Sequence, residues 1–423
     1  MRVQLGAPGR SVSIRNRLGA AACVLLASGG PAMAQTDSVT TTQFDATALL
    51  YGEKSRTNVV EPMARITRLF PSGQVISAQL GIDVMTGASP SGAMPAGRPQ
   101  TTTSASGTVS TTAADELPTA RFSDRRFVLD GDWQRAYFGT LTPMIGLHYS
   151  REKDYQSVGA TGKLSLDLMQ RLTQVTIGGG YNYDDVFPVG GVRVGLSDGI
   201  GRVGDGTELK RVTSGLVGLS RVLTRRWMIG VTGSRSHERG YLTEPYKIVS
   251  LIQPDSGITV GSVTERRPDT RDRRNVLGST VYHFARDVLY ASYRSYWDDW
   301  QVRSHTVDLK YRHELESPSY FEPHVRLYTQ TSASFFRFGL IDGAPLPEFA
   351  SSDLRLGPLK SVTVGGTYGF RLPDSPGEWT VRAEYIGQFG DGHPKDAIGV
   401  QRQFSLFPSL SIGSLLIGYS INF

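Results

Sequence analysis

The feature that most limits how this chain can fold is an alternation of apolar and polar residues with a period of two, repeated along most of its length. In the final segment, one face carries an apolar or aromatic residue at every second position: Leu415, Ile417, Tyr419, Ile421 and Phe423. A β-strand places successive side chains on opposite faces. Because no amphipathic helical periodicity competes over the same stretches, the chain is predicted to be all-β.

The alternation predicts about sixteen strands, with fourteen as the alternative count, near residues 44–52, 58–69, 75–86, 127–137, 142–152, 158–169, 173–184, 210–222, 226–237, 274–285, 287–299, 302–314, 319–331, 358–371, 378–389 and 412–423. A strand of about twelve residues, rising roughly 3.3 Å per residue at a tilt of about 40°, covers roughly 30 Å. That length spans the apolar band, about 25 Å tall, of an outer-membrane barrel.

Connection lengths point to the same architecture. Short turns alternate with long connections near residues 87–126, 185–209, 238–273, 332–357 and 390–411. Outer-membrane barrels show this asymmetry, with short periplasmic turns and longer external loops. Hydrophobic residues make up only 39% of the chain, which suits a barrel because half of each strand faces a polar interior. We therefore expect a closed antiparallel transmembrane β-barrel.

The first long connection, residues 87–126, is expected to be a flexible external loop. Its composition is rich in Thr, Ser, Ala, Gly and Pro, and such a stretch is not expected to form a core. No globular segment precedes the first strand, which argues against a plugged, energised transporter. Residues 35–423 are accordingly expected to form one barrel domain.

The N-terminal residues 1–34 have the pattern of a cleaved signal peptide. A basic start is followed by a short apolar run and by the cleavage-site pattern Ala32-Met33-Ala34. The run contains the only cysteine, Cys23, so the mature chain is expected to form no disulfide. Removal of this segment lowers the net charge from +6 to about +2, and nucleic acid is therefore not an expected partner. Export to the outer membrane of a Gram-negative bacterium is the expected localisation.

Charged residues inside the predicted strands are the most informative polar feature. They lie on the face opposite the apolar one, and they are candidates for lining the lumen: Arg294, Asp298, Asp308, Lys310, Arg312, Glu322, His324, Arg326, Arg382 and Glu384. Charges that face lipid at mid-depth cost a few kcal/mol each, whereas charges that face a wet lumen can pair. They form either a constriction that selects solutes or cross-strand pairs that fix the strand register.

The last strand resembles the C-terminal signal that the barrel-assembly machinery reads in outer-membrane barrels. Its expected recognition residues are Tyr419, Ile421 and Phe423. Outer-membrane lipid, the assembly machinery and periplasmic chaperones are the expected partners, and small solutes are the expected cargo. Aromatic residues near strand ends, such as Trp227, Trp300 and Tyr320, fit the interfacial girdles of such barrels.

The sequence lacks the common motifs for a zinc protease site and for phosphate binding by a P-loop. It contains no H-E-x-x-H and no P-loop, and its seven His residues show no metal-ligand spacing. No cofactor, no metal and no catalytic residue is expected. A Ser–His pair formed across strands on the barrel wall, as in an outer-membrane lipase, remains an open alternative.

Several segments resemble the DUF3570 family of exported proteobacterial proteins of unknown function: Phe44–Tyr51, Val60–Pro62, Thr86–Pro90, Gly240–Lys247, Glu265–Arg271, Tyr296–Trp300 and Ser304–Thr306. The resemblance covers essentially the whole mature chain, and residues 97–114 look like an insertion. It implies an outer-membrane barrel without an established activity. Two of the segments fall in the long connection 238–273 and supply candidate gate residues: Tyr241, Glu244, Tyr246, Lys247, Arg266, Arg267 and Asp269.

Three functions follow from this interpretation. The leading one is a porin-like channel that passes small solutes. The second is a closed barrel that binds a partner or acts in assembly through its external loops, where function often resides. The third is a hydrolase on the barrel wall.

Overall fold

The computed structural model describes residues 40–54, 56–103, 109–198, 206–315, 318–373 and 375–423. The expected signal peptide, residues 1–34, lies outside the described residues. Part of the expected insertion at 97–114 also lies outside them. Within the described part, no helix is both long enough and apolar enough to cross a membrane.

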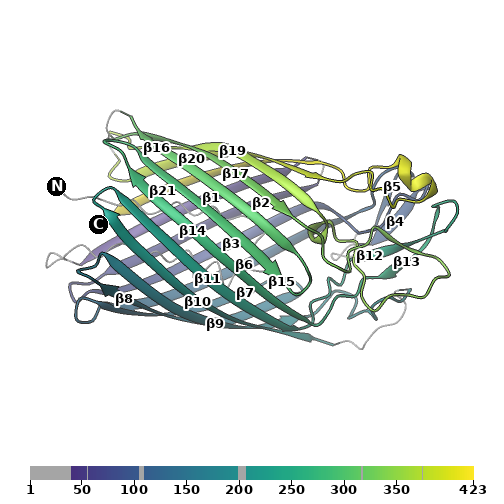
Figure 1. Ribbon diagram of the computed structural model, residues 1–423, viewed down its shortest axis with the longest axis horizontal. Helices are drawn as coiled ribbons and strands as arrows, with labels where there is room; N and C mark the ends of the chain where they lie inside the picture. The colour runs from purple at the N-terminus through teal and green to yellow at the C-terminus, as the bar shows by residue number, and fades with distance from the viewer. Residues whose placement is uncertain (1–39, 55, 104–108, 199–205, 316–317, 374) are drawn as a thin grey trace.

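Sixteen antiparallel strands form one closed barrel (Figure 1). In the order in which they neighbour one another, they are β1 (Thr41–Glu53), β2 (Thr57–Leu69), β3 (Gln74–Pro90), β6 (Thr119–Arg135), β7 (Leu141–Arg151), β8 (Tyr155–Leu168), β9 (Thr173–Val186), β10 (Glu208–Thr224), β11 (Trp227–Gly240), β14 (Thr270–His283), β15 (Val288–Asp298), β16 (Arg303–Glu314), β17 (Tyr320–Gln330), β19 (Leu359–Phe370), β20 (Glu378–Gly390) and β21 (Leu410–Asn422). The predicted fold class and strand count are confirmed.

The barrel closes between its first and last strands. Strand β1 pairs with β21 from Gln43 opposite Asn422 to Glu53 opposite Ile412. Beyond this register, Thr42 and Phe423 exchange two backbone hydrogen bonds of 2.7 and 2.9 Å. Closure leaves neither strand with an unpaired edge, which is a requirement for a sheet that spans lipid.

The two faces of the wall differ in chemistry as the alternation predicts. Large apolar side chains stand exposed on the outside, among them Ile177 and Val217 at 56% and 58% exposure. Charged and polar side chains occupy the alternate, inward positions. Exposed apolar side chains over a whole barrel wall match an exterior that contacts lipid.

The long connections gather at the end of the barrel opposite the C-terminus and the start of β1, here called the outer end (Figure 1). Their described residues contain five short strands and two 3-10 helices: β4 (Gln100–Thr103), β5 (Val109–Thr112), β12 (Ile248–Ile252), β13 (Thr259–Thr264), β18 (Gly339–Ile341), η2 (Leu354–Leu356) and η3 (Gly399–Gln403). Strands β13, β12 and β18 form one small sheet, in which β12 and β18 run parallel.

Three clusters of buried apolar side chains hold these connections together. They centre on Trp300 with Phe335 and Phe336, on Met94 with Leu406, and on the small sheet. The clustered residues come from connections between barrel strands and from β12, β13 and β18. We call this packed unit, the described residues of 91–118, 187–198, 241–269, 299–302, 331–358 and 391–409, the cap.

The expectation that the connection 87–126 forms no core is therefore wrong at its start. Strands β3 and β6 extend into it for several residues, as far as Pro90 and from Thr119 onward. Ala93, Met94 and Ala96 are buried, and Met94 packs in a cluster with side chains of three other connections. Met94 is buried because apolar side chains more than 150 positions away in the chain pack against it.

Aromatic residues near strand ends divide into two groups. Trp227, Tyr282, Phe284 and Tyr311 make a series of ring contacts around the end with short turns, as interfacial girdles do. Trp300, by contrast, is buried in the cap, and Tyr320 is buried beneath Arg312. The girdle interpretation is wrong for these two residues because each ring packs inside the protein.

Candidate functional site: a charged lumen beneath a loop cap

A histidine on the inner wall connects two carboxylates on different strands. His324 of β17 contacts the Glu384 carboxylate through Nδ1 at 2.8 Å and the Asp308 carboxylate through Nε2 at 3.1 Å. In the register, His324 lies opposite Gly365 of β19, which in turn lies opposite Glu384 of β20. Because Gly365 has no side chain, His324 can reach Glu384 across the intervening strand.

Close packing fixes this arrangement at Gly365. A Cβ placed there would overlap the backbone carbonyl of Ala383 and the side chain of Glu384. A larger residue would therefore displace the glutamate from the histidine. A glycine inside a strand often marks such a close approach.

Other candidate lumen residues surround this histidine. Asp308 lies directly opposite Arg326 in the register, with the guanidinium Nε 3.9 Å from the carboxylate, and Lys310 lies opposite His324. Arg382 is buried and donates to the Thr367 hydroxyl at 2.9 Å. These side chains therefore form one mixed-charge network over β16 to β20.

The remaining candidates lie away from that network. Arg312 pairs with Glu314 at 2.6 Å near the short-turn end. Asp298 lies at the outer end, where it accepts hydrogen bonds from Arg271 and from the backbone of Val302 and is fully shielded from solvent. Two further candidates, Arg294 and Glu322, occupy inward positions on β15 and β17.

Sequence reasoning missed a second charged network on other strands. Arg65 of β2 bonds Asp132 of β6 at 2.9 Å, and His148 of β7 contacts Asp130 at 2.6 Å. These residues carry the same signal as the predicted set, since they are charged residues on the polar face of predicted strands. Two separate stretches of the inner wall are thus lined by paired charges.

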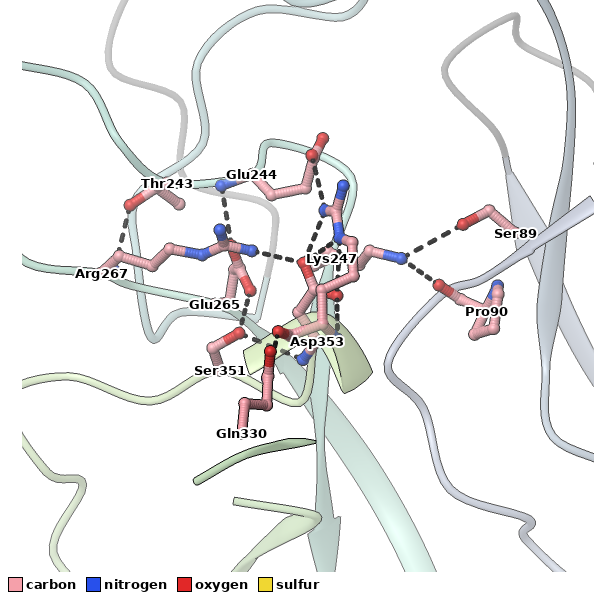
Figure 2. Close-up of polar contacts among 11 residues, drawn as sticks. Ser89, Pro90, Thr243, Glu244, Lys247, Glu265, Arg267, Gln330, Ser351 and Asp353 are labelled. Atoms are coloured by element: carbon pink, nitrogen blue, oxygen red, sulfur yellow. Dashed lines mark hydrogen bonds and ion pairs between the residues drawn. The ribbon is translucent and has the colours of Figure 1, made fainter. Parts of the chain in front are cut away.

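The cap contains its own buried ionic network, shown in Figure 2. Arg267 lies between two carboxylates, 2.6 Å from Glu265 and 2.9 Å from Asp353. Glu265 is fully buried and also accepts hydrogen bonds from the Ser351 hydroxyl at 2.5 Å and the backbone of Glu244 at 2.7 Å. The network thereby joins the connection that follows β11 to the one that follows β17.

Asp353 has a second role at the start of a helix. Its carboxylate accepts hydrogen bonds from the backbone and the guanidinium of Arg355, and so it caps η2. Arg355 extends the network to Glu244 at 3.2 Å. One carboxylate therefore orders both the helix and the contact between two connections.

Two further candidate gate residues bind other parts of the wall. The buried Lys247 ammonium donates to the backbone carbonyl of Pro90 and lies 3.4 Å from the Ser89 hydroxyl (Figure 2). Tyr246 donates to Asp154 in the β7–β8 turn and accepts from the backbone of Val189 at 3.0 Å. These contacts connect the 241–269 segment to the end of β3, to the β7–β8 turn and to the 187–198 connection.

The remaining gate candidates do not join this network. Tyr241 donates its backbone N–H to Leu209 at 2.9 Å, Arg266 stacks over the Phe349 ring, and the Asp269 side chain is exposed. Of the seven candidates, the structure therefore brings Glu244, Lys247 and Arg267 together.

Burial and neighbouring charges have opposite effects on the pKa values of the ionisable groups in the cap. Burial raises the pKa of Glu265 and lowers the pKa of Lys247. For Asp353, burial acts to raise the pKa, but Arg355, Lys247 and Arg267 hold it well below its ordinary value. Asp353 therefore stays ionised at any pH near neutral, and the network depends on that charge.

Three carboxylates near the cap lie close enough together to share a cation. Oxygens of Asp124, Glu152 and Asp154 lie within 4.8 Å of one another. Burial raises the pKa of Asp154, which already accepts the hydroxyl of Tyr246, and Arg126 lies 3.7 Å from Glu152. Side chains of the protein thus already engage two of these three groups.

The residues expected to signal barrel assembly lie at the closing strand. Tyr419 and Ile421 belong to β21, and the Tyr419 ring lies 4.8 Å from that of Trp379. Phe423 follows the strand and is 71% exposed. Their recognition by the assembly machinery stays a prediction.

Comparison with known families gives one match, to the model described as a protein of unknown function, DUF3570, over residues 15–421. No curated protein matches the sequence.

Solved structures with a similar course of the chain are outer-membrane channels and receptors. OpdK of Pseudomonas aeruginosa, solved with vanillate, is 8% identical, with 91% of this chain and 99% of that chain covered and a TM-score of 0.41. The monoaromatic hydrocarbon channel TodX, as a deletion mutant, is 11% identical, with 92% and 91% covered and a TM-score of 0.40. The ferric enterobactin receptor PfeA is 10% identical, with a TM-score of 0.42; 90% of this chain is covered, but only 60% of the receptor's length.

Proposed function

The chain belongs to the DUF3570 family, and from that premise we propose that it is a porin-like channel for small hydrophilic solutes in an outer membrane. The observation that carries the proposal is a closed sixteen-strand wall with paired charges on its inner face. Barrels of sixteen to eighteen strands leave an aqueous channel, whereas eight-stranded barrels are filled by side chains. The apolar outer face supports residence in the membrane.

The inner wall favours passage of polar solutes. Three apolar clusters occur among the described residues, and all of them lie in the cap. Within the lumen, positive groups such as Lys310 and Arg326 alternate with negative groups such as Asp308 and Glu384. A lining of both signs suits small polar solutes and disfavours strong selection of one ion.

The cap supports a gating role for the outer connections. Its polar contacts join the end of β3 to the segments that follow β11 and β17, so a shift in one of these parts affects the others. We propose that solute enters when this network loosens.

Single-channel recording of the refolded barrel tests the channel proposal. The wild-type protein should conduct. Lys310→Glu should shift the reversal potential in the direction of greater cation selectivity, because it replaces a positive lumenal charge with a negative one. Lys395→Glu makes the same charge change at an exposed position in the 391–409 connection and should leave selectivity unchanged. Equal reversal potentials for Lys310→Glu and wild type would remove Lys310 from the conduction path.

A cap variant separates a gated channel from a closed barrel. Asp353→Asn should raise the open probability, because it removes the charge that holds Arg267 and Arg355. If both the wild type and this variant are folded and heat-modifiable but silent, the channel proposal fails. That result would favour the alternative, in which the ordered cap of a closed barrel binds an external partner.

A further inference from the structure

A group of basic residues faces outward at the outer end of the barrel. It comprises Arg211, Arg235, Arg239, Arg274, Arg303 and Lys360, from β10, β11, β14, β16 and β19, and we call it the basic belt. All six are exposed, and they share their strand faces with lipid-facing residues such as Val217, Val231 and Val362. The belt therefore lies on the outer wall and not in the lumen.

Like charges lie directly opposite one another within the belt. Arg211 pairs in register with Arg239, and Arg235 pairs with Arg274. Trp297 of β15 connects this second row to Arg303. Opposed like charges destabilise a sheet, so a bound anion would stabilise this part of the wall.

The protein supplies little negative charge to the belt. Asp272 bonds Arg235 and lies 3.6 Å from Arg274, so one carboxylate serves two guanidinium groups. Asp185 occupies an outward position opposite Leu209, two residues from Arg211. Among the described residues, no ion pair involves Arg211, Arg239, Arg303 or Lys360. Four of the six belt residues therefore form no ion pair with the part of the chain that the structure describes.

The height of the belt matches the edge of the apolar band. On β11, Arg235 lies eight positions after the girdle residue Trp227, and Arg239 lies twelve positions after it. At about 3.3 Å per residue and a tilt of about 40°, these positions lie roughly 20 and 30 Å above Trp227. They bracket the upper edge of a band about 25 Å tall, where lipid headgroups meet the acyl chains.

We propose that the basic belt is a docking surface for an outer-leaflet lipid whose headgroup carries more than one phosphate. Guanidinium groups bind phosphate through paired hydrogen bonds. The apolar wall directly below the belt would receive the acyl chains of the same molecule. The proposal is independent of conduction, because none of the belt residues faces the lumen.

The test measures lipid binding to the refolded, delipidated barrel by native mass spectrometry and by titration with fluorescent lipid. The probes are bisphosphorylated lipid A, monophosphorylated lipid A and phosphatidylcholine. The wild type should bind the bisphosphorylated form most tightly, and its affinity should fall as salt rises. The triple variant Arg211→Gln, Arg239→Gln, Arg303→Gln should bind it on the order of 100-fold more weakly, since each basic residue near an anionic surface contributes about a factor of five.

A matched control removes outward basic residues at the other end of the barrel. Arg68→Gln with Arg221→Gln should fold and bind lipid A like the wild type. Heat-modifiability on gels establishes folding of each variant, and separate single substitutions in the belt replace the triple variant if it does not fold. Equal affinity of the belt variants and the wild type overturns the proposal. Equal binding of lipid A and phosphatidylcholine, or displacement of lipid A by millimolar inorganic phosphate, overturns it as well.

Discussion

Asp353 shows how one buried charge can order several segments. It accepts bonds from Arg267 and Arg355 and caps η2, and it is almost fully shielded from solvent. A buried charge is expensive to leave without its partner, so the removal of either side of such a pair costs more than the pair contributes. The stability of the cap should therefore depend strongly on this residue.

We expect Asp353→Asn to destabilise the cap by on the order of 3 kcal/mol, because Arg267 keeps its charge but loses one of its two anionic partners. Hydrogen exchange measured by mass spectrometry should rise in residues 241–269 and 331–358 while the barrel strands stay protected. Glu348→Gln is the matched control, because Glu348 is exposed in the same connection. Equal exchange in the two variants would argue against this role.

Acid should loosen the cap through the same residue. The pKa of Asp353 is held well below its ordinary value by Arg355, Lys247 and Arg267, against the effect of burial. Its stabilising contribution is therefore complete above pH of about 4, the ordinary value for Asp, and is lost as the pH falls toward the lowered pKa. Limited proteolysis of the cap at pH 7, 5 and 3 should show cleavage rising below about pH 4. Asp353→Asn should lack this step.

At the level of the strand, the direction of each side chain decides the effect of a charge. Val217 lies in the middle of β10 and is 58% exposed on the outer face. We expect Val217→Arg to lower the free energy of unfolding in vesicles by about 2–4 kcal/mol, the cost of a charge at the bilayer midplane. Urea titration followed by tryptophan fluorescence measures this value. Val217→Leu should behave like the wild type, and a similar loss in both variants would place Val217 away from lipid.

The strands could be predicted from the sequence because their period of two is local information. Strands β9 and β16, for example, differ from their predicted bounds by two residues at most. The predicted β3 ended four residues early and the predicted β6 began eight residues late, because Ser, Thr, Gly and charged residues on both faces hide the alternation where these strands leave the membrane.

Contacts between distant segments could not be predicted in this way. His324 reaches Glu384 only because β17, β19 and β20 are neighbours and Gly365 lies between the two side chains. Lys247 meets Pro90 across 157 positions of the chain. Charged strand residues identified the inner wall, but the partner of each residue depends on strand order and register.

For the whole molecule, the register between the first strand, β1, and the last strand, β21, can be tested by a disulfide. Thr42 and Phe423 form a hydrogen-bonded pair, and such pairs alternate along an antiparallel ladder. Leu49 and Leu416 are therefore a non-hydrogen-bonded pair, with Cα atoms about 4.5 Å apart. We expect Leu49→Cys with Leu416→Cys to form an intramolecular disulfide in the folded barrel, since this separation suits one. A faster-migrating band on non-reducing gels would reveal it.

The control places the second cysteine on the same face of β21 but at a position that does not lie opposite Leu49. Ile412 lies four residues from Leu416 on β21, a shift of roughly 13 Å along the strand. Leu49→Cys with Ile412→Cys should stay unlinked. Disulfide formation in this control, or none in the Leu49 and Leu416 pair, would contradict the observed closure.

The first and last barrel strands pair with each other in the same way as every other pair of neighbouring strands. The hydrogen bonding of the folded wall therefore does not depend on which strand comes first in the sequence. A circularly permuted chain, with β21 joined to β1 by a short linker and new ends at the Arg286–Asp287 turn, would contain the same ladder of backbone bonds. It would differ in which strand emerges last from synthesis. Such a permutant would therefore show whether folding requires only the strand pairing of the finished barrel or also requires β21 to be the last strand synthesised.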